Sequence, residues 1–373
     1  MAKTIYFVAG EASADNHGAA LLRALRNTEG DLRFIGRGGP RMKSVAGTDF
    51  QDWIEKSGVL GLWEVIKQYG YFRREFTETL REIAENQPDA VVLIDYPGFN
   101  LRLACALRKR SPSQKIIYYI SPQVWAWNRG RIKKMARWLD LMLCIFSFEA
   151  DLYNESGLRT IFVGHPMIER LAEKKIDAQR DPTLVGLFPG SRAREIRKIF
   201  PVLIETAREL RKSKPSLRFE VAAASDDLAR RIESALDSTG RERFAIKVGE
   251  TSEIMQRAFA GIVASGSATL ESAYFRMPFA LIYKVAWPTY FAGRLLVKVK
   301  YLGMPNVLAD KEVVPEFIQY RAQPAEIATE VARLIDDAQA RQQMIWEFDK
   351  IAAQLGESGA SERAAKAILA EIA

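Results

Sequence analysis

Cysteine and histidine are scarce in this chain. Its 373 residues include two cysteines, Cys105 and Cys144, and two histidines, His17 and His165. The cysteines lie far apart in apolar runs, so we expect neither a disulfide framework nor a thiolate metal site. Without a clustered carboxylate motif, a transition-metal site is not expected either. This scarcity favours the reducing setting of the cytoplasm and a protein that binds no metal.

Long apolar runs and low-complexity tracts are also lacking. No uninterrupted apolar run approaches the ~20 residues that a membrane-spanning helix needs. The first residues run into a strand pattern without a signal-peptide cleavage site. Hydrophobic residues make up 48% of the chain and charged residues 27%, an ordinary globular composition. We therefore expect the whole chain to fold and not to span a membrane.

Basic residues outnumber acidic ones. The net charge of +8 favours an anionic partner, which is a nucleic acid, a phosphorylated substrate or an anionic lipid surface. The sequence contains no zinc-finger spacing, no RNA-binding sheet signature and no recognisable helix-turn-helix. A nucleic acid is therefore not expected, and charge alone leaves the other two partners open.

The order of elements predicts an α/β protein with two domains. The chain exceeds the length at which one hydrophobic core stops growing. Strand-like runs alternate with amphipathic helical stretches, which predicts a parallel sheet covered on both faces, and this pattern occurs twice. In the first half we expect the strands Thr4–Ala9, Arg33–Ile35, Ala90–Ile94, Lys115–Ile120, Leu141–Ile145 and Thr160–Val163. In the second half we expect Thr183–Phe188, Arg218–Ala222, Phe244–Val248, Gly261–Ala264 and Phe279–Lys284.

The expected domain boundaries follow from this alternation. Residues 1–168 form the first domain and residues 183–335 the second, with the charged segment Glu169–Pro182 as the linker. From Pro324 onward the pattern is helical. Residues 336–373 are expected to form C-terminal helices, which either cap the second domain or cross back to the first.

A dinucleotide-binding fingerprint is not met after the first strand. The turn Gly10–Asp15 lacks the second glycine that lets a pyrophosphate approach the backbone. Gly36–Gly39 is expected to form a glycine-rich turn after the second strand, but such a cluster is weak evidence by itself. An oxidoreductase is therefore disfavoured.

Two turns in the second half are typical of a phosphate site. Arg192 follows a strand and precedes a helix, where its guanidinium would hold a diphosphate or simply lie at the surface. In Ala264–Glu271 a strand ends in small residues that open a helix, and free amides at a helix N-terminus attract phosphate. Glu271 would accept hydrogen bonds from a ribose or act as a partner of the helix dipole.

One aspartate in the first half stands at the end of a predicted buried strand. Asp95 precedes a Pro-Gly turn, and open α/β sheets bind ligands at the carboxyl ends of their strands. It is either a general base or acceptor-sugar ligand, or a turn former. His17 is expected to orient part of a cleft or cap a helix rather than to titrate as a base.

Aromatic and basic residues gather in three segments. Residues 59–74 have more large apolar side chains than a solvated helix needs, so they form a membrane-interface segment or a core helix. The membrane-facing residues would be Leu62, Trp63, Ile66, Tyr69, Phe72, Arg73 and Arg74. Trp287–Tyr301 is similar. Gln123–Arg137 contains no acidic residue, and it is a solvated face or meets a sugar phosphate or anionic headgroups.

Seven short segments, in order along nearly the whole chain, resemble the motifs of the bacterial lipid-A-disaccharide synthases. They are Gly10–Asp15, Asp95–Asn100, Ser121–Trp127, Phe148–Glu149, Val163–Pro166, Pro189–Arg192 and Met304–Asn306. Ala14 stands where many members have glycine, which weakens the resemblance little.

The resemblance implies a GT-B fold, with two Rossmann-like domains whose parallel sheets face a central cleft. It also implies an inverting hexosyltransferase that needs no metal or other cofactor. Its donor would be UDP-diacylglucosamine and its acceptor diacylglucosamine 1-phosphate, giving a β-1,6-linked lipid A disaccharide 1-phosphate and UDP. The setting would be lipopolysaccharide synthesis in Gram-negative bacteria, with the enzyme peripheral on the inner face of the inner membrane.

The family's site residues transfer to this chain by motif position. The resemblance implies catalytic roles for Asp95 and Arg192. It places UDP on Arg192, Ser265, Gly266, Ser267, Glu271, Asn306 and Gln319. It places the acceptor against Glu11, Ser13, Asp15 and His17.

Two other classes of protein remain as alternatives. A UDP-sugar epimerase of related architecture would share the UDP half but would not need the aromatic and basic segments. A non-catalytic lipid- or nucleotide-binding protein would not need Asp95 and would bind UDP-sugar without turnover.

Overall fold

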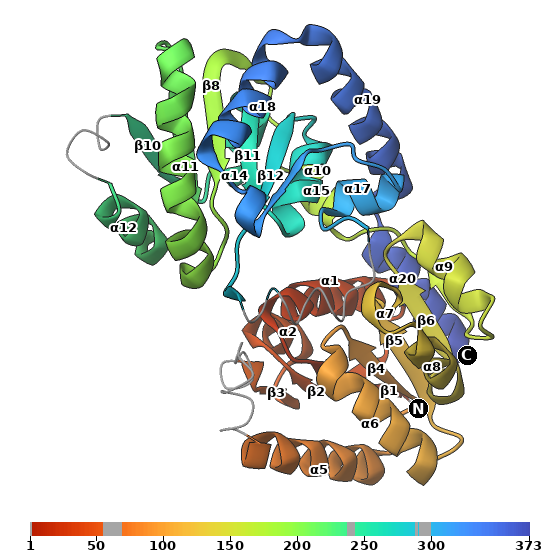
Figure 1. Ribbon diagram of the computed structural model, residues 1–373. Coiled ribbons are helices and arrows are strands. Elements are labelled where there is room, and N and C mark those ends of the chain that lie inside the picture. The colour runs from red at the N-terminus through yellow and green to blue at the C-terminus, as the bar shows by residue number, and fades with distance from the viewer. Residues whose placement is uncertain (1, 55–68, 237–242, 288–289, 291–299) are drawn as a thin grey trace. The chain divides into compact units, whose positions relative to one another are not determined.

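The computed structural model describes residues 2–54, 69–236, 243–287, 290 and 300–373. The chain forms two compact units, and each contains a parallel β-sheet with helices on both faces (Figure 1). Unit 1 comprises Met1–Glu169 and Leu355–Ala373, and unit 2 comprises Arg170–Gln354. Of the C-terminal helices, α19 (Ala338–Gln354) lies in unit 2 and α20 (Ala360–Glu371) in unit 1.

The sheet of unit 1 has the order β3-β2-β1-β4-β5-β6-β7, and its strands are parallel. The chain order reverses between β1 and β4, which makes that pair the topological switch point where such sheets bind ligands. The strands are β1 (Lys3–Ala9), β2 (Leu32–Gly38), β3 (Phe50–Asp52), β4 (Ala90–Ile94), β5 (Lys115–Tyr119), β6 (Leu141–Cys144) and β7 (Thr160–Phe162). The other helices are α1 (Ala12–Thr28), α2 (Pro40–Ala46), α5 (Tyr69–Asn86), α6 (Pro97–Arg110), α7 (Val124–Trp127), η1 (Arg129–Arg131), α8 (Ile132–Trp138), α9 (Ser147–Asn154) and α10 (Met167–Ala172), the last of which crosses the boundary between the units.

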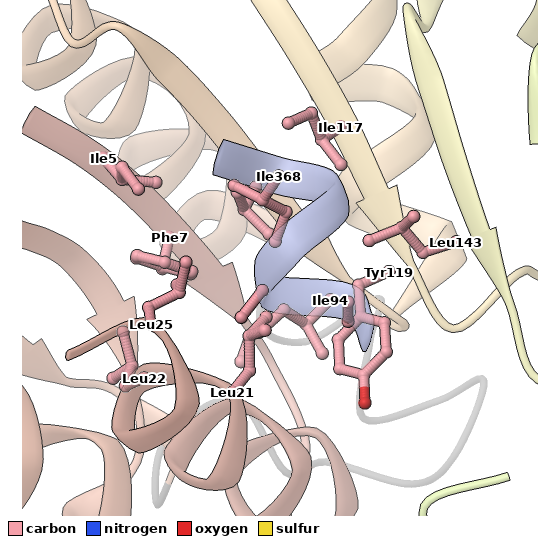
Figure 2. Packing of buried hydrophobic residues seen from close by; sticks show 14 of the residues in the cluster. Ile5, Phe7, Leu21, Leu22, Leu25, Ile94, Ile117, Tyr119, Leu143 and Ile368 are labelled. Atoms are coloured by element: carbon pink, nitrogen blue, oxygen red, sulfur yellow. The ribbon is translucent and has the colours of Figure 1, made fainter. Parts of the chain in front are cut away.

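Alternate residues of each central strand face opposite sides of this sheet and enter separate cores. Ile5 and Phe7 of β1 pack with residues of α1 and α20, and Figure 2 shows Ile368 of α20 seated over the strands. Tyr6 and Val8 pack on the other side with residues of α5, α6 and α8. Because both faces are covered, the central strands are predominantly apolar, and β4 is apolar throughout.

The sheet of unit 2 has the order β10-β9-β8-β11-β12-β13 and is also parallel. Its switch point lies between β8 and β11. The strands are β8 (Asp181–Phe188), β9 (Arg218–Ala223), β10 (Phe244–Val248), β11 (Ala258–Ala264), β12 (Phe279–Tyr283) and β13 (Glu316–Ile318). The other helices are α11 (Ala193–Ser213), α12 (Asp226–Ser234), α14 (Thr251–Arg257), α15 (Ser267–Tyr274), α17 (Met304–Ala309), η2 (Gln319–Arg321) and α18 (Pro324–Asp336).

The expected strands are all present, with ends that differ by up to three residues. One expectation was wrong: Gly36 to Gly38 belong to β2 rather than to a turn. Gly36 has a φ of +131°, and a Cβ there would overlap the backbone of Phe7 in β1. The short strands β3 (Phe-Gln-Asp) and β13 (Glu-Phe-Ile) were not expected, because each has only three residues and includes a charged side chain, so neither forms an apolar run.

A buried arginine fastens α5 to the sheet. The side chain of Arg37 on β2 is 1% exposed and forms ion pairs with Glu75 and Glu82 of α5. The hydroxyl of Tyr6 on β1 donates to Glu82 as well. Burial lowers the pKa of Arg37, but the interactions with Glu82 and Tyr6 together outweigh it and raise the pKa, so the guanidinium stays charged. The network fixes α5, whose first residues are the last ones of the aromatic segment 59–74.

Candidate functional site

A pocket of about 420 Å³ lies at the switch point of unit 2. Its walls come from the segments that follow β8, β9, β10 and β11, together with α10. It brings together five of the residues expected to bind UDP, namely Arg192, Ser265, Gly266, Ser267 and Glu271.

The turn after β8 presents Arg192 at this pocket. Gly190 has a φ of +106°, and a Cβ there would overlap the carboxylate of Glu195. That carboxylate accepts a hydrogen bond from the amide of Ser191 at 3.0 Å and pairs with Arg192 Nη1 at 3.2 Å. The Arg192 side chain is 50% exposed. Glu195 therefore orients a cation that can still meet a ligand.

The turn after β11 opens a helix toward the same pocket. Gly266 has a φ of +153° and is the N-cap of α15, which begins at Ser267. Gly266 and Ser267 are exposed and line the pocket. Thr269 Oγ1 donates to the carbonyl of Gly266 at 2.8 Å and so fixes this turn. The helix dipole and first-turn amides favour an anion here.

Glu271, one turn into α15, is 9% exposed and lines the pocket. Its Oε1 accepts a hydrogen bond from Arg170 Nη2 at 2.8 Å. Arg170 belongs to α10 and lines the pocket as well. The sequence did not point to this arginine, because it lies 101 positions from Glu271 in a segment without a motif.

Asn306 and Gln319 do not line the pocket. Asn306 is fully buried, and its side chain bonds the amides of Val313 and Val314, the carbonyl of Val314 and the carboxylate of Glu316. Gln319 exchanges two hydrogen bonds with the backbone of Val285. The structure therefore gives both residues a role in holding loops of unit 2.

At the switch point of unit 1, β4 ends in two consecutive left-handed residues. Asp95 has a φ of 47° and Tyr96 a φ of 50°. Such a conformation costs a non-glycine residue about 1–3 kcal/mol, and it is typically found at functional sites. Burial, and after it the charge of Glu11, raise the pKa of Asp95 from 3.8 to about 6. Glu11 directly precedes α1.

The remaining acceptor-side residues lie along α1. Ser13 is exposed and His17 half-buried. Asp15 is buried, and its carboxylate accepts hydrogen bonds from the amides of Gly39, Arg41 and Met42 at 2.9 to 3.1 Å. Asp15 thus caps the N-terminus of α2.

Unit 1 contains a second buried carboxylate, for which no role was expected from the sequence, on the helix that follows β6. Glu149, in the first turn of α9, is fully buried. Its Oε2 accepts from Ser121 Oγ at 2.5 Å and its Oε1 from Trp125 Nε1 at 2.8 Å. Burial raises the pKa of Glu149 to about 7, while these hydrogen bonds lower it. The Glu149 side chain therefore connects two of the motifs, Ser121–Trp127 and Phe148–Glu149.

The proposed membrane segment is only partly described. Leu62, Trp63, Ile66 and the side chain of Tyr69 lie outside the described residues. Farther along α5, Phe72 is half-buried and Arg73 and Arg74 are exposed. In the second aromatic segment Trp287 is 52% exposed. In the basic run Gln123–Arg137, the cations Arg129, Lys133, Lys134 and Arg137 are exposed.

Two features are absent from the described part of the chain. None of its helices is long and apolar enough to cross a membrane. Within the same residues, no three histidine, cysteine, aspartate or glutamate side chains group as metal ligands would.

Comparison with solved structures identifies the fold. MurG from Acinetobacter baumannii matches with a TM-score of 0.57 and 13% identity over 99% of both chains. A UDP-GlcNAc 2-epimerase from Neisseria meningitidis, bound to UDP-GlcNAc, matches with a TM-score of 0.64 and 13% identity over 98% of this chain and 99% of that one. At this identity the likeness shows the fold alone, which is the GT-B type expected from the sequence.

Comparison by sequence identifies the family. The family model described as Lipid-A-disaccharide synthetase matches residues 5–372. The lipid-A-disaccharide synthase of Geobacter sulfurreducens is 39% identical over 98% of this chain and 96% of its own. That of Myxococcus xanthus is 35% identical over the same shares. The chain therefore belongs to the lipid-A-disaccharide synthase family and is a glycosyltransferase of the hexosyltransferase class.

Proposed function

We propose that the protein transfers 2,3-diacylglucosamine from UDP to 2,3-diacylglucosamine 1-phosphate with inversion. The products are the β-1,6-linked disaccharide 1-phosphate and UDP. One observation carries the proposal: the carboxyl edge of each sheet has a distinct chemistry at its switch point. Unit 2 offers a cation and a helix N-terminus, and unit 1 offers a carboxyl group with a raised pKa.

Unit 2 is the UDP side in this proposal. The diphosphate lies on the amides that open α15, with Arg192 against it, and both stabilise the charge that develops as UDP leaves. Glu271, which Arg170 holds at 2.8 Å, accepts hydrogen bonds from the ribose. Asn306 and Gln319 support the surrounding loops rather than touch UDP, because their amides bond the backbone.

Unit 1 is the acceptor side, and Asp95 is the general base. An inverting transfer needs one in-line attack, in which the acceptor hydroxyl loses its proton as the new bond forms. A pKa of about 6 leaves Asp95 largely ionised at neutral pH, and it brings the group closer to the operating pH than an ordinary aspartate. Glu11, Ser13 and His17 face the acceptor, and Asp15 positions α2 beside them.

Substitutions on the two sides test this division. Asp95→Asn should lower turnover by ~10²–10⁴-fold, the usual range for a general base, with UDP affinity kept. Arg192→Ala should weaken UDP binding measured by calorimetry. Arg208→Ala is its matched control, because Arg208 lies on α11, whose N-cap is Arg192, and forms an exposed i,i+3 pair with Glu205. Normal turnover of Asp95→Asn, or equal UDP affinities of the two arginine variants, would contradict the assignment.

Product analysis separates the transferase from an epimerase of the same fold. The protein is incubated with the UDP-linked donor alone and with donor plus acceptor, and products are identified by mass spectrometry. We expect a disaccharide 1-phosphate only when both are present. An altered UDP-sugar formed from the donor alone would favour the epimerase, and binding without any product would favour a non-catalytic protein.

We also propose that the enzyme attaches to the cytoplasmic face of the Gram-negative inner membrane without spanning it. Both substrates have acyl chains, and exposing each CH₂ to water costs ~0.8 kcal/mol. Leu62, Trp63, Ile66, Tyr69 and Phe72 would enter the interface, with Arg73 and Arg74 against anionic headgroups. Replacing Trp63 and Phe72 by serine should lower co-sedimentation with anionic liposomes and leave UDP affinity intact. Equal sedimentation would assign the segment to core packing.

A further inference from the structure

Two side chains donate hydrogen bonds to one backbone atom of the left-handed turn at Asp95. That atom is the carbonyl oxygen of Asp95 itself. Tyr118 lies on β5, beside β4, with Leu93 as its partner in the ladder. Its hydroxyl donates to the Asp95 carbonyl at 2.5 Å. Burial, with the charge of Asp95, raises the pKa of Tyr118 well above its usual value, so the phenol stays protonated and remains a donor.

A second donor reaches the same carbonyl from α6. Asn100 is fully buried, and its Nδ2 lies 2.8 Å from the Asp95 carbonyl oxygen. The same nitrogen lies 3.3 Å from the carbonyl of Ile94 and 3.4 Å from that of Val8. Asn100 therefore ties the turn to both strands of the switch point. A carbonyl oxygen has two acceptor sites, and these two side chains fill them.

The next residue is also fixed in place. Gly10 follows β1, and a Cβ on it would overlap the ring of Tyr96. The ring of Trp53 meets that of Tyr96 edge-on at 6.2 Å, and Phe99 stacks on it at the same distance. Because the ring occupies the space that Gly10 leaves open, the peptide between Asp95 and Tyr96 is held at both ends.

We propose that Tyr118 and Asn100 are positioning residues for glycosyl transfer. They hold the Asp95 carbonyl so that the left-handed turn directs the Asp95 carboxylate at the acceptor hydroxyl. The inference rests on the proposed role of Asp95 as base. A return of Asp95 to a right-handed φ would swing its Cβ and carboxylate to a new direction, and a misplacement of about 1 Å can cost ~10²-fold in rate.

Tyr118→Phe tests this with the loss of a single hydroxyl. We expect kcat to fall ~10–100-fold, while the KM for the acceptor and the UDP affinity change less than about twofold because neither ligand touches Tyr118. Tyr119→Phe is the matched control. It removes a buried hydroxyl from the neighbouring position of β5, but its side chain belongs to the core on the opposite face of the sheet. Tyr119→Phe should keep kcat.

A double-mutant cycle with Asp95→Asn distinguishes positioning from a general loss of structure. If Tyr118 acts through Asp95, then Tyr118→Phe should cause no further loss of kcat in the Asp95→Asn background. An equal loss in both backgrounds, or an unchanged kcat in the single variant, would overturn the inference. Near-normal turnover of Asp95→Asn alone would instead refute the proposed base, so the two failures are distinguishable.

Discussion

The charge of Glu11 should shift the acid limb of the pH–rate profile. Burial is the larger cause of the raised pKa of Asp95, and Glu11 is the next. The rise from 3.8 to about 6 spans about two pKa units. Because Glu11 is the smaller contributor, Glu11→Gln should remove at most ~1 of these units, which corresponds to ~1.4 kcal/mol.

The effect is largest near pH 5. A group with a pKa of ~6 is about 10% ionised at pH 5, and one with a pKa of ~5 is about half ionised. The rate at pH 5, relative to its own plateau, should therefore rise up to ~5-fold in Glu11→Gln. The measurement is kcat/KM for the acceptor from pH 4.5 to 8, which reports the pKa of the free enzyme. The plateau itself can fall, since Glu11 is proposed to face the acceptor.

Glu29→Gln is the matched control. Glu29 is the C-cap of α1, whereas Glu11 is the N-cap, so both changes remove one carboxylate from an end of the same helix. The acid limb of Glu29→Gln should match that of the parent. An unmoved limb in Glu11→Gln, or equal movement in both variants, would show that the titrating group is not Asp95 under the influence of Glu11.

Three further predictions concern stability. The pKa of Glu149 is raised from 4.5 to about 7, so between these pH values the folded state holds a proton that the unfolded state has released. The stability of the parent protein therefore falls as pH rises through this window. The melting temperature of Glu149→Gln should fall less than that of the parent over the same window. Asn306→Ala removes the partner of the Val313 and Val314 amides and one of the donors to Glu316, so it should cost about 2–4 kcal/mol in chemical denaturation, while calorimetry should find UDP affinity unchanged in the folded protein. Arg37→Met should cost about 3 kcal/mol by removing the cation of a buried network, whereas Arg33→Met, which breaks an exposed pair with Asp49, should cost less than ~1 kcal/mol. The first prediction fails if the melting temperatures of Glu149→Gln and of the parent fall equally with pH. The second fails if the unfolding midpoint of Asn306→Ala equals that of the parent, and the third if Arg37→Met and Arg33→Met lose equal stability.

The sequence was informative wherever a role depends on a few adjacent residues. Apolar runs placed β4 and β8, and the parallel pattern put Asp95 and Arg192 at the carboxyl ends of those strands, where the structure has them. Small residues after β11 indicated the opening of α15, because glycine and serine there permit the turn. These features are local, and local propensity determines them.

Contacts between distant parts of the chain were not predictable in this way. The Arg170–Glu271 bond joins positions 101 apart, and Glu149 lies 28 positions after Ser121, to which it is bonded. Such pairs depend on strand order and on the length of each connecting helix, which periodicity does not specify. Motif position suggested UDP contacts for Asn306 and Gln319, yet both face backbone groups. A motif indicates that a residue type is needed and leaves open whether it meets a ligand or a loop.

The return of α20 to unit 1 affects the order in which this protein matures during synthesis. Ala364, Ala365 and Ile368 belong to the same core cluster as Ile5 and Phe7, so the core around β1 is completed only after α20, which follows unit 2 in the chain, has been made. Unit 2 is continuous and can complete its core beforehand, although N-terminal domains usually fold first during translation. Until then the apolar side chains of α1 and of the sheet that α20 covers stay exposed, and a nascent chain in that state is expected to bind chaperones.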